Sequence, residues 1–199
     1  MAILGTVLIV LAGCATTQPA RFFVLSPMSG PDEATPVAGG EELSLGIGPI
    51  RIPEYLDRTP IVIRTSGNAI DLEEFDRWGE PLADNIARVV GEDLATLLGT
   101  NRVAIYPWDR RRAVDYQLEV DILQFDRDPD GTAILRGRWS LKDGKRSVLM
   151  TKKSLIRITP EGPDTEALVA ALSRCLADFS REVAAAIPVP GDGKRQGGM

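Results

Sequence analysis

Histidine is absent from this 199-residue sequence, and cysteine occurs only twice, at Cys14 and Cys175. The absence of histidine excludes Ser-His-Asp and Cys-His catalytic sites, histidine-bound zinc and the most common general base near neutral pH. Two cysteines are too few for a four-ligand metal site. We therefore expect no metal and no cofactor, and the side chains that enzymes most often use for catalysis are missing, although this alone does not exclude enzymatic chemistry.

Clustered positive charge is also scarce. The net charge is −5, and the one basic run is Arg110-Arg111-Arg112, which we interpret as a solvated loop. Because nucleic-acid binding depends on clustered lysine and arginine at the phosphates, we expect no nucleic-acid partner.

The first 13 residues carry no charged side chain, and residues 3–12 are almost all apolar. A helix of this length spans roughly 20 Å, which is too short for a ~30 Å hydrocarbon core, so the run predicts a signal peptide and not a membrane span. It ends in Leu11-Ala12-Gly13-Cys14, which resembles the lipobox of bacterial lipoproteins. We expect cleavage between Gly13 and Cys14 and lipidation of Cys14. No basic residue follows Met1, so we expect the true start to lie upstream.

Lipidation of Cys14 would leave Cys175 without a disulfide partner. Cys175 lies on the apolar face of a predicted helix, where a small buried thiol is common. Ala15 follows the lipidated position, and by resemblance to enterobacterial sorting signals this favours the outer membrane, with the folded domain in the periplasm.

Hydrophobic periodicity predicts an α+β fold, an antiparallel-rich sheet with two amphipathic helices packed on one face. Alternation and turn residues predict strands at 22–25, 43–47, 61–65, 69–72, 102–106, 116–122, 135–141 and 147–158. Three-to-four spacing predicts helices at 81–98 and 165–187, the second with Asp164 as its N-cap. Gly46 and Gly48 predict a bulge or an edge strand, because Pro49 lacks the N–H that a phosphate loop would use.

The predicted organisation is a signal peptide at 1–13, the lipidated cysteine and a tether at 14–20, one domain at 21–187 and a disordered tail at 188–199. Within the domain, the two central strands alternate apolar and charged residues in matching order. We therefore predict the cross-strand pairs Ile122–Leu135, Leu118–Trp139, Glu119–Arg138 and Asp121–Arg136.

A proline-framed loop at 53–60 contains Tyr55, Leu56, Asp57 and Arg58. Tyrosine and arginine are enriched at interface hot spots, so one interpretation is a partner-binding surface formed by these residues together with Trp78. The other interpretation is a loop packed onto its own domain. For Trp78 and Trp108, packing at the edge of the core is the more frequent role.

Several motifs resemble the PqiC-type family of ABC-type transport auxiliary lipoproteins, also called the DUF330 or YmbA family. They are Gly46-x-Gly48-Pro49-x-x-Ile52-Pro53-x-Tyr55-Leu56-Asp57-Arg58, Phe75-Asp76-Arg77-Trp78-x-Glu80-Pro81-Leu82, Tyr106-Pro107-Trp108, Tyr116-x-Leu118-x-Val120-Asp121 and Phe125-Asp126. The resemblance implies a non-catalytic docking subunit of an intermembrane phospholipid transport system. Its implied partners are an MCE-domain protein with its ABC transporter or permease, and self-assembly into a ring is consistent with the family.

Two alternatives remain open at this point. The first is a lipid carrier that binds phospholipid in a cavity between the sheet and the helices. The second is a hydrolase that uses a carboxylate pair, for which Glu119 and Asp121 are the candidates, although both have predicted arginine partners.

Overall fold

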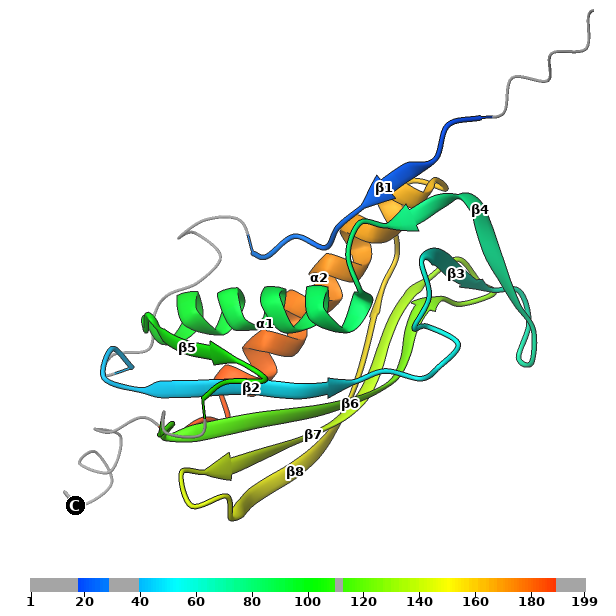
Figure 1. Ribbon diagram of the computed structural model, residues 1–199. Coiled ribbons are helices and arrows are strands. Elements are labelled where there is room, and N and C mark those ends of the chain that lie inside the picture. Colours follow the sequence, from blue (N-terminus) through cyan, green and yellow to red (C-terminus); the bar gives the residue numbers. More distant parts are fainter. Residues whose placement is uncertain (1–17, 29–39, 110–112, 189–199) are drawn as a thin grey trace, which may run out of the picture.

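One mixed β-sheet with two helices on the same face makes up the domain (Figure 1). The computed structural model describes residues 18–28, 40–109 and 113–188. Its strands are β1 (Arg21–Phe23), β2 (Ser44–Arg51), β3 (Pro60–Arg64), β4 (Ile70–Trp78), β5 (Arg102–Ile105), β6 (Tyr116–Arg127), β7 (Ala133–Asp143) and β8 (Val148–Ile158). Its helices are α1 (Leu82–Leu98) and α2 (Thr165–Ala184).

The sheet combines parallel and antiparallel pairing. Its order is β1-β4-β3-β6-β2-β5, and β7 and β8 extend it from the other edge of β6. The longest ladders, β6–β7 and β7–β8, are antiparallel, as is the β3–β4 hairpin. Strands β1–β4, β2–β5, β2–β6 and β3–β6 pair in parallel over shorter stretches. The predicted α+β class is therefore confirmed, with parallel pairs that local sequence patterns did not indicate.

The register of the central hairpin differs from the prediction. The observed pairs include Leu118–Leu141, Val120–Trp139 and Asp121–Arg138. The predicted register is therefore wrong by two residues along this part of β6. A slip of two keeps every side chain on its own face of the sheet, so the apolar pattern alone does not exclude it. The register is set instead by a turn, in which the Asp128 N–H donates to the Thr132 carbonyl at 2.8 Å, and by a bulge at Leu123.

The starts of both helices and the end of α1 lie within one residue of the prediction, but α2 ends at Ala184, three residues before the predicted Ile187. Helix α1 follows Pro81 and stops at Gly99, which adopts a left-handed conformation that glycine tolerates without strain. The Asp164 side chain caps α2 by accepting the Ala167 N–H at 2.8 Å. Helix α1 packs on β2 and β5, and α2 packs on β7 and β8. None of the described helices has the length and apolar character needed to cross a membrane.

Large side chains fill the space between the sheet and the helices. Trp139 and Phe179 meet there edge-to-face with ring centroids 6.4 Å apart, and both are almost fully buried. Cys175 is buried in the same layer as a free thiol, and burial raises its pKa to about 12. The burial of Cys175 confirms the sequence prediction of a small thiol in the core.

Residues 24–28, here called the N-terminal strap, follow β1 and lie along the two helices. Three strap N–H groups donate to helix side chains: Leu25 to Asn85 Oδ1 at 3.1 Å, Ser26 to Ser173 Oγ at 3.1 Å and Met28 to Asp93 Oδ1 at 2.8 Å. These bonds fix the entry of the chain into the domain. The predicted signal peptide, Gly13, Cys14, Arg110–Arg112 and nearly all of the predicted tail lie outside the described residues.

Candidate functional site

The loop between β2 and β3 is a compact turn held by its own backbone. The N–H groups of Leu56 and Asp57 donate to the carbonyls of Pro53 and Glu54 at 2.9 and 3.2 Å. The Thr59 carbonyl accepts the Trp78 N–H at 2.8 Å, which fixes the loop to the end of β4. The loop therefore has a defined shape.

Only part of the predicted partner surface is exposed. Asp57 and Arg58 face solvent and Tyr55 is half-buried, but Leu56 and Trp78 are 2% and 5% exposed and belong to the core. Leu56 and Trp78 are therefore wrong as members of the candidate partner surface, and for them the other interpretation, packing onto their own domain, is confirmed, because their large apolar side chains gain more by burial in the core. Asp57 and Arg58, with the edge of Tyr55, remain as the candidate surface.

A buried polar network beneath the loop explains its tyrosine. The Tyr55 hydroxyl donates to Asp126 Oδ2 at 3.0 Å, and the Arg64 guanidinium donates to the same oxygen at 3.2 Å. Gln124 donates to Asp126 Oδ1 at 2.8 Å, so both oxygens of this fully buried carboxylate are bonded. Burial, and after it the Asp126 charge, raises the pKa of Tyr55 to about 12. Tyr55 and Asp126 both stand in the family-like motifs, but sequence reasoning did not predict their contact.

The Tyr106-Pro107-Trp108 motif packs against the two glycines of β2. The Trp108 ring lies against Gly46 so closely that a Cβ there would approach Trp108 Cη2 to 2.5 Å. Tyr106 packs edge-to-face on Trp108 with centroids 5.9 Å apart, beside Gly48. A groove of about 630 Å³ runs along these rings, bordered by Glu119 and Lys142. The predicted bulge in β2 is confirmed by a register shift between Ile47 and Ile50.

The outer face of the sheet, which the helices do not cover, carries paired charges. Glu119 binds Lys142 at 2.6 Å, and Asp121 binds Arg51 and Arg138 at 3.1 and 3.3 Å. The predicted partners Arg138 for Glu119 and Arg136 for Asp121 are therefore wrong, because of the two-residue change in register.

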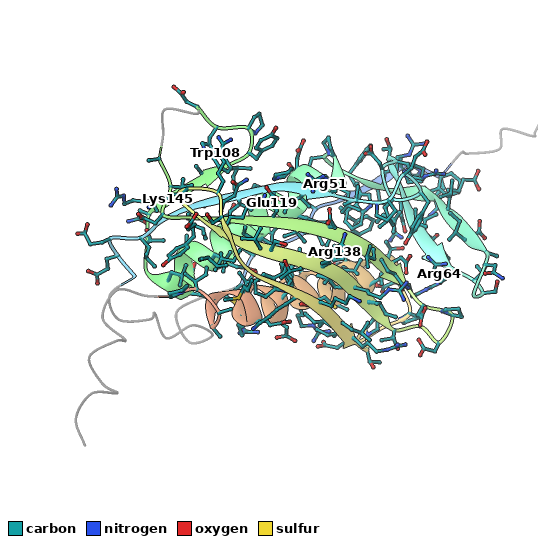
Figure 2. All side chains as sticks on the ribbon, turned by 90° about the horizontal axis from the view of Figure 1, so that it is seen from below. Arg51, Arg64, Trp108, Glu119, Arg138 and Lys145 are labelled. Carbon is teal, nitrogen blue, oxygen red and sulfur yellow. The ribbon has the colours of Figure 1, made fainter. Side chains whose placement is uncertain are left out.

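Figure 2 shows Glu119 with Arg51 and Arg138 along this face and Trp108 near one end of it. With basic partners on both carboxylates, Glu119 and Asp121 do not form a free carboxylate pair of the kind a hydrolase needs. Within the described ranges, no cluster of three or more acidic or cysteine side chains is arranged to hold a metal ion.

The comparisons with known proteins address the family and the fold. A comparison with curated protein sequences finds no match. A crystal structure described only as that of an uncharacterized protein superimposes with a TM-score of 0.70 at 18% identity, covering 86% of this chain and all of the other. The structure of XCC0632 from Xanthomonas campestris, a DUF330 protein, gives a TM-score of 0.67 at 17% identity and covers 82% of this chain and 92% of the other. At these identities the similarity establishes the fold alone.

The sequence itself matches the model of the ABC-type transport auxiliary lipoprotein component over residues 23–184. This span runs from the end of β1 to the end of α2 and so includes the loop, the buried network and the aromatic groove. The family gives the chain a transport-associated role at a membrane. The chain belongs to the family of ABC-type transport auxiliary lipoproteins.

Proposed function

We propose that this chain is an outer-membrane lipoprotein and the non-catalytic docking subunit of an MCE-type ABC system that moves phospholipid between membranes. The observation that carries the proposal is the family match over residues 23–184. The lipobox ending in Cys14 supports anchoring by a lipid, and Ala15 supports delivery to the outer membrane. Because each buried CH₂ contributes about 0.8 kcal/mol, several acyl chains would hold the protein stably.

Asp57 and Arg58 are the part of the loop suited to an MCE partner. Their side chains are exposed and of opposite charge, on a backbone that Leu56 and the Tyr55–Asp126 bond hold in place. A rigid loop loses little conformational freedom when a partner binds, so more of the contact energy appears as affinity. A mixed charge pair also favours a partner with the complementary arrangement over one of uniform charge.

The packing of the domain favours docking over lipid carriage. In the described part of the chain, the layer between sheet and helices is occupied by buried side chains such as Leu94, Trp139 and Phe179. The grooves beside the strap and along Trp108 lie at the surface instead, with volumes of about 600 and 630 Å³. Native mass spectrometry of the protein in mild detergent distinguishes the two roles, since bound phospholipid would support lipid carriage and its absence would support docking. The same spectra give the copy number of any ring.

Co-purification with the MCE partner tests the docking proposal. The double variant Asp57→Ala/Arg58→Ala should lose the MCE protein while remaining in the outer-membrane fraction. The matched control is Asp84→Ala/Lys145→Ala, which removes one exposed acid and one exposed base at other sites. Equal recovery of the MCE protein by both double variants would overturn this surface, and a chain that never recovers it would overturn the docking role.

A further inference from the structure

Strand β1 and the residue that follows it present two apolar side chains to solvent. Phe22 is 65% exposed, and Val24, the first strap residue, is 51% exposed. The intervening Phe23 is partly buried against the core, and the Arg21 guanidinium lies 5.4 Å from its ring centroid. The alternation of a strand therefore places Phe22 and Val24 on the same outward side. Neighbouring exposed phenylalanine and valine side chains are more typical of an interaction surface than of a face that contacts only water.

These side chains border a groove between the strap and α2. The groove has a volume of about 600 Å³, and Val169, Ala170 and Ala177 of α2 contribute its apolar side. The strap cannot move into the groove without losing hydrogen bonds, since the Ser26 N–H is bonded to Ser173 Oγ and the Met28 N–H to Asp93. The hollow is therefore preformed, and its opening continues the apolar surface of Phe22 and Val24.

The charges around the groove do not favour an anionic ligand. Arg21 is held by a bidentate pair with Asp76, with both N–O distances 2.7 Å, and Arg174 is bound to Glu161 at 2.6 Å. Glu166, which also lines the groove, adds negative charge. Apolar contact, and not attraction to an acidic surface, is thus what this site offers.

The short distance in sequence between Phe22 and Cys14 limits what can cover the groove. Phe22 follows Cys14 by eight residues. A fully extended chain of that length spans at most about 28 Å, so a lipid on Cys14 would keep Phe22 within that distance of the bilayer. This tether gives the apolar surface a high effective concentration at the lipid interface.

We propose that Phe22, Val24 and the groove between residues 24–28 and α2 rest against the bilayer in which Cys14 is anchored. This inference depends on the proposed lipidation. The two side chains enter the boundary between headgroups and acyl chains, and the groove is covered by lipid. Because the groove lies on the helix side of the domain, the outer face of the sheet is then turned away from the membrane (Figure 1).

Fluorescence quenching by brominated lipid measures this contact directly. The full lipidated chain is reconstituted in phosphatidylcholine vesicles with and without brominated acyl chains, as the parent protein and as Phe22→Trp. The matched control is Val148→Trp on β8, since Val148 is also exposed, at 58%, and lies far from the strap in the sheet order. We expect the added tryptophan to be quenched at position 22 and not at position 148.

The outcomes separate this inference from the proposed function. If mass spectrometry shows lipid on Cys14 but position 22 is quenched no more than position 148, the inference fails and the anchoring stands. Quenching that requires phosphatidylglycerol in the vesicles, or a second copy that shields position 22, would also overturn the inference. A chain without lipid on Cys14 would overturn both proposals.

Discussion

Replacing Asp126 with alanine should reduce the free energy of unfolding by about 3 kcal/mol. The carboxylate is fully buried and accepts hydrogen bonds from Tyr55, Arg64 and Gln124. Removing one partner of a buried ion pair typically costs about 3–5 kcal/mol, because the other charge stays buried without compensation. The Arg64 side chain is 19% exposed, so water reaches it in part and the lower end of that range applies.

A double-mutant cycle separates the contribution of the Tyr55–Asp126 hydrogen bond from that of the other contacts of Asp126. Tyr55→Phe removes one hydroxyl donor and should cost about 1 kcal/mol, whereas the matched control Tyr116→Phe should cost less than about 0.5 kcal/mol. In the Asp126→Ala background, Tyr55→Phe should cost almost nothing, which is a coupling of about 1 kcal/mol. Urea unfolding, monitored by circular dichroism, gives the free energy of unfolding of the parent protein, the two single variants and the double variant, and also that of the control.

Two results would refute this reasoning. One is a loss of stability for Asp126→Ala that is no larger than the loss for Glu74→Ala. Glu74 is an exposed acid on β4, so its replacement should change the free energy of unfolding by less than about 0.5 kcal/mol. The other is additivity of Tyr55→Phe and Asp126→Ala, because it would mean that the 3.0 Å contact contributes no energy.

The remaining predictions concern three further positions. Gly46→Ala should displace the Trp108 ring and destabilise the domain by about 1–3 kcal/mol, which is measured as a change in tryptophan fluorescence and a lower urea midpoint. The control Gly67→Ala should not move Trp108, because the space around Gly67 is open. The pKa of Tyr55 is raised to about 12 in the folded state from 10.0, so stability should fall as the pH rises from about 10 to about 12, and Tyr55→Phe should remove part of that fall. The Cys175 thiol, buried and with its pKa raised to about 12, should react with a thiol reagent only when denaturant unfolds the domain; rapid reaction of the native chain would contradict its burial.

Local sequence patterns predict the elements well where one physical signal dominates. Helix α1 begins after Pro81 and ends at Gly99 as expected, and Asp164 caps α2. The hairpin around residues 66–68 is also present, as β3 and β4. The second half of β4 is missing from the prediction because residues 73–78 alternate poorly between apolar and polar. Tertiary pairing with β1 and β3, and not local preference, makes this segment a strand.

The arrangement of the site is harder to predict because it depends on contacts far apart in the chain. The sequence indicates that Tyr55 and Trp108 matter, but Tyr55 meets Asp126 across 71 positions and Trp108 covers Gly46. These contacts follow from the parallel pairing of β2 with β5 and β6, for which no local signal exists. The burial of Trp78 and Leu56 has the same origin, since several elements close over them together.

The most direct test of the docking role is photo-cross-linking in intact cells with a photoreactive residue in place of Asp57. We predict a cross-link to the MCE protein in the outer-membrane fraction, which is absent when the same residue replaces Asp84. A cross-link of equal strength from both positions, or none from Asp57 while the chain is lipidated and in the outer membrane, would contradict the account.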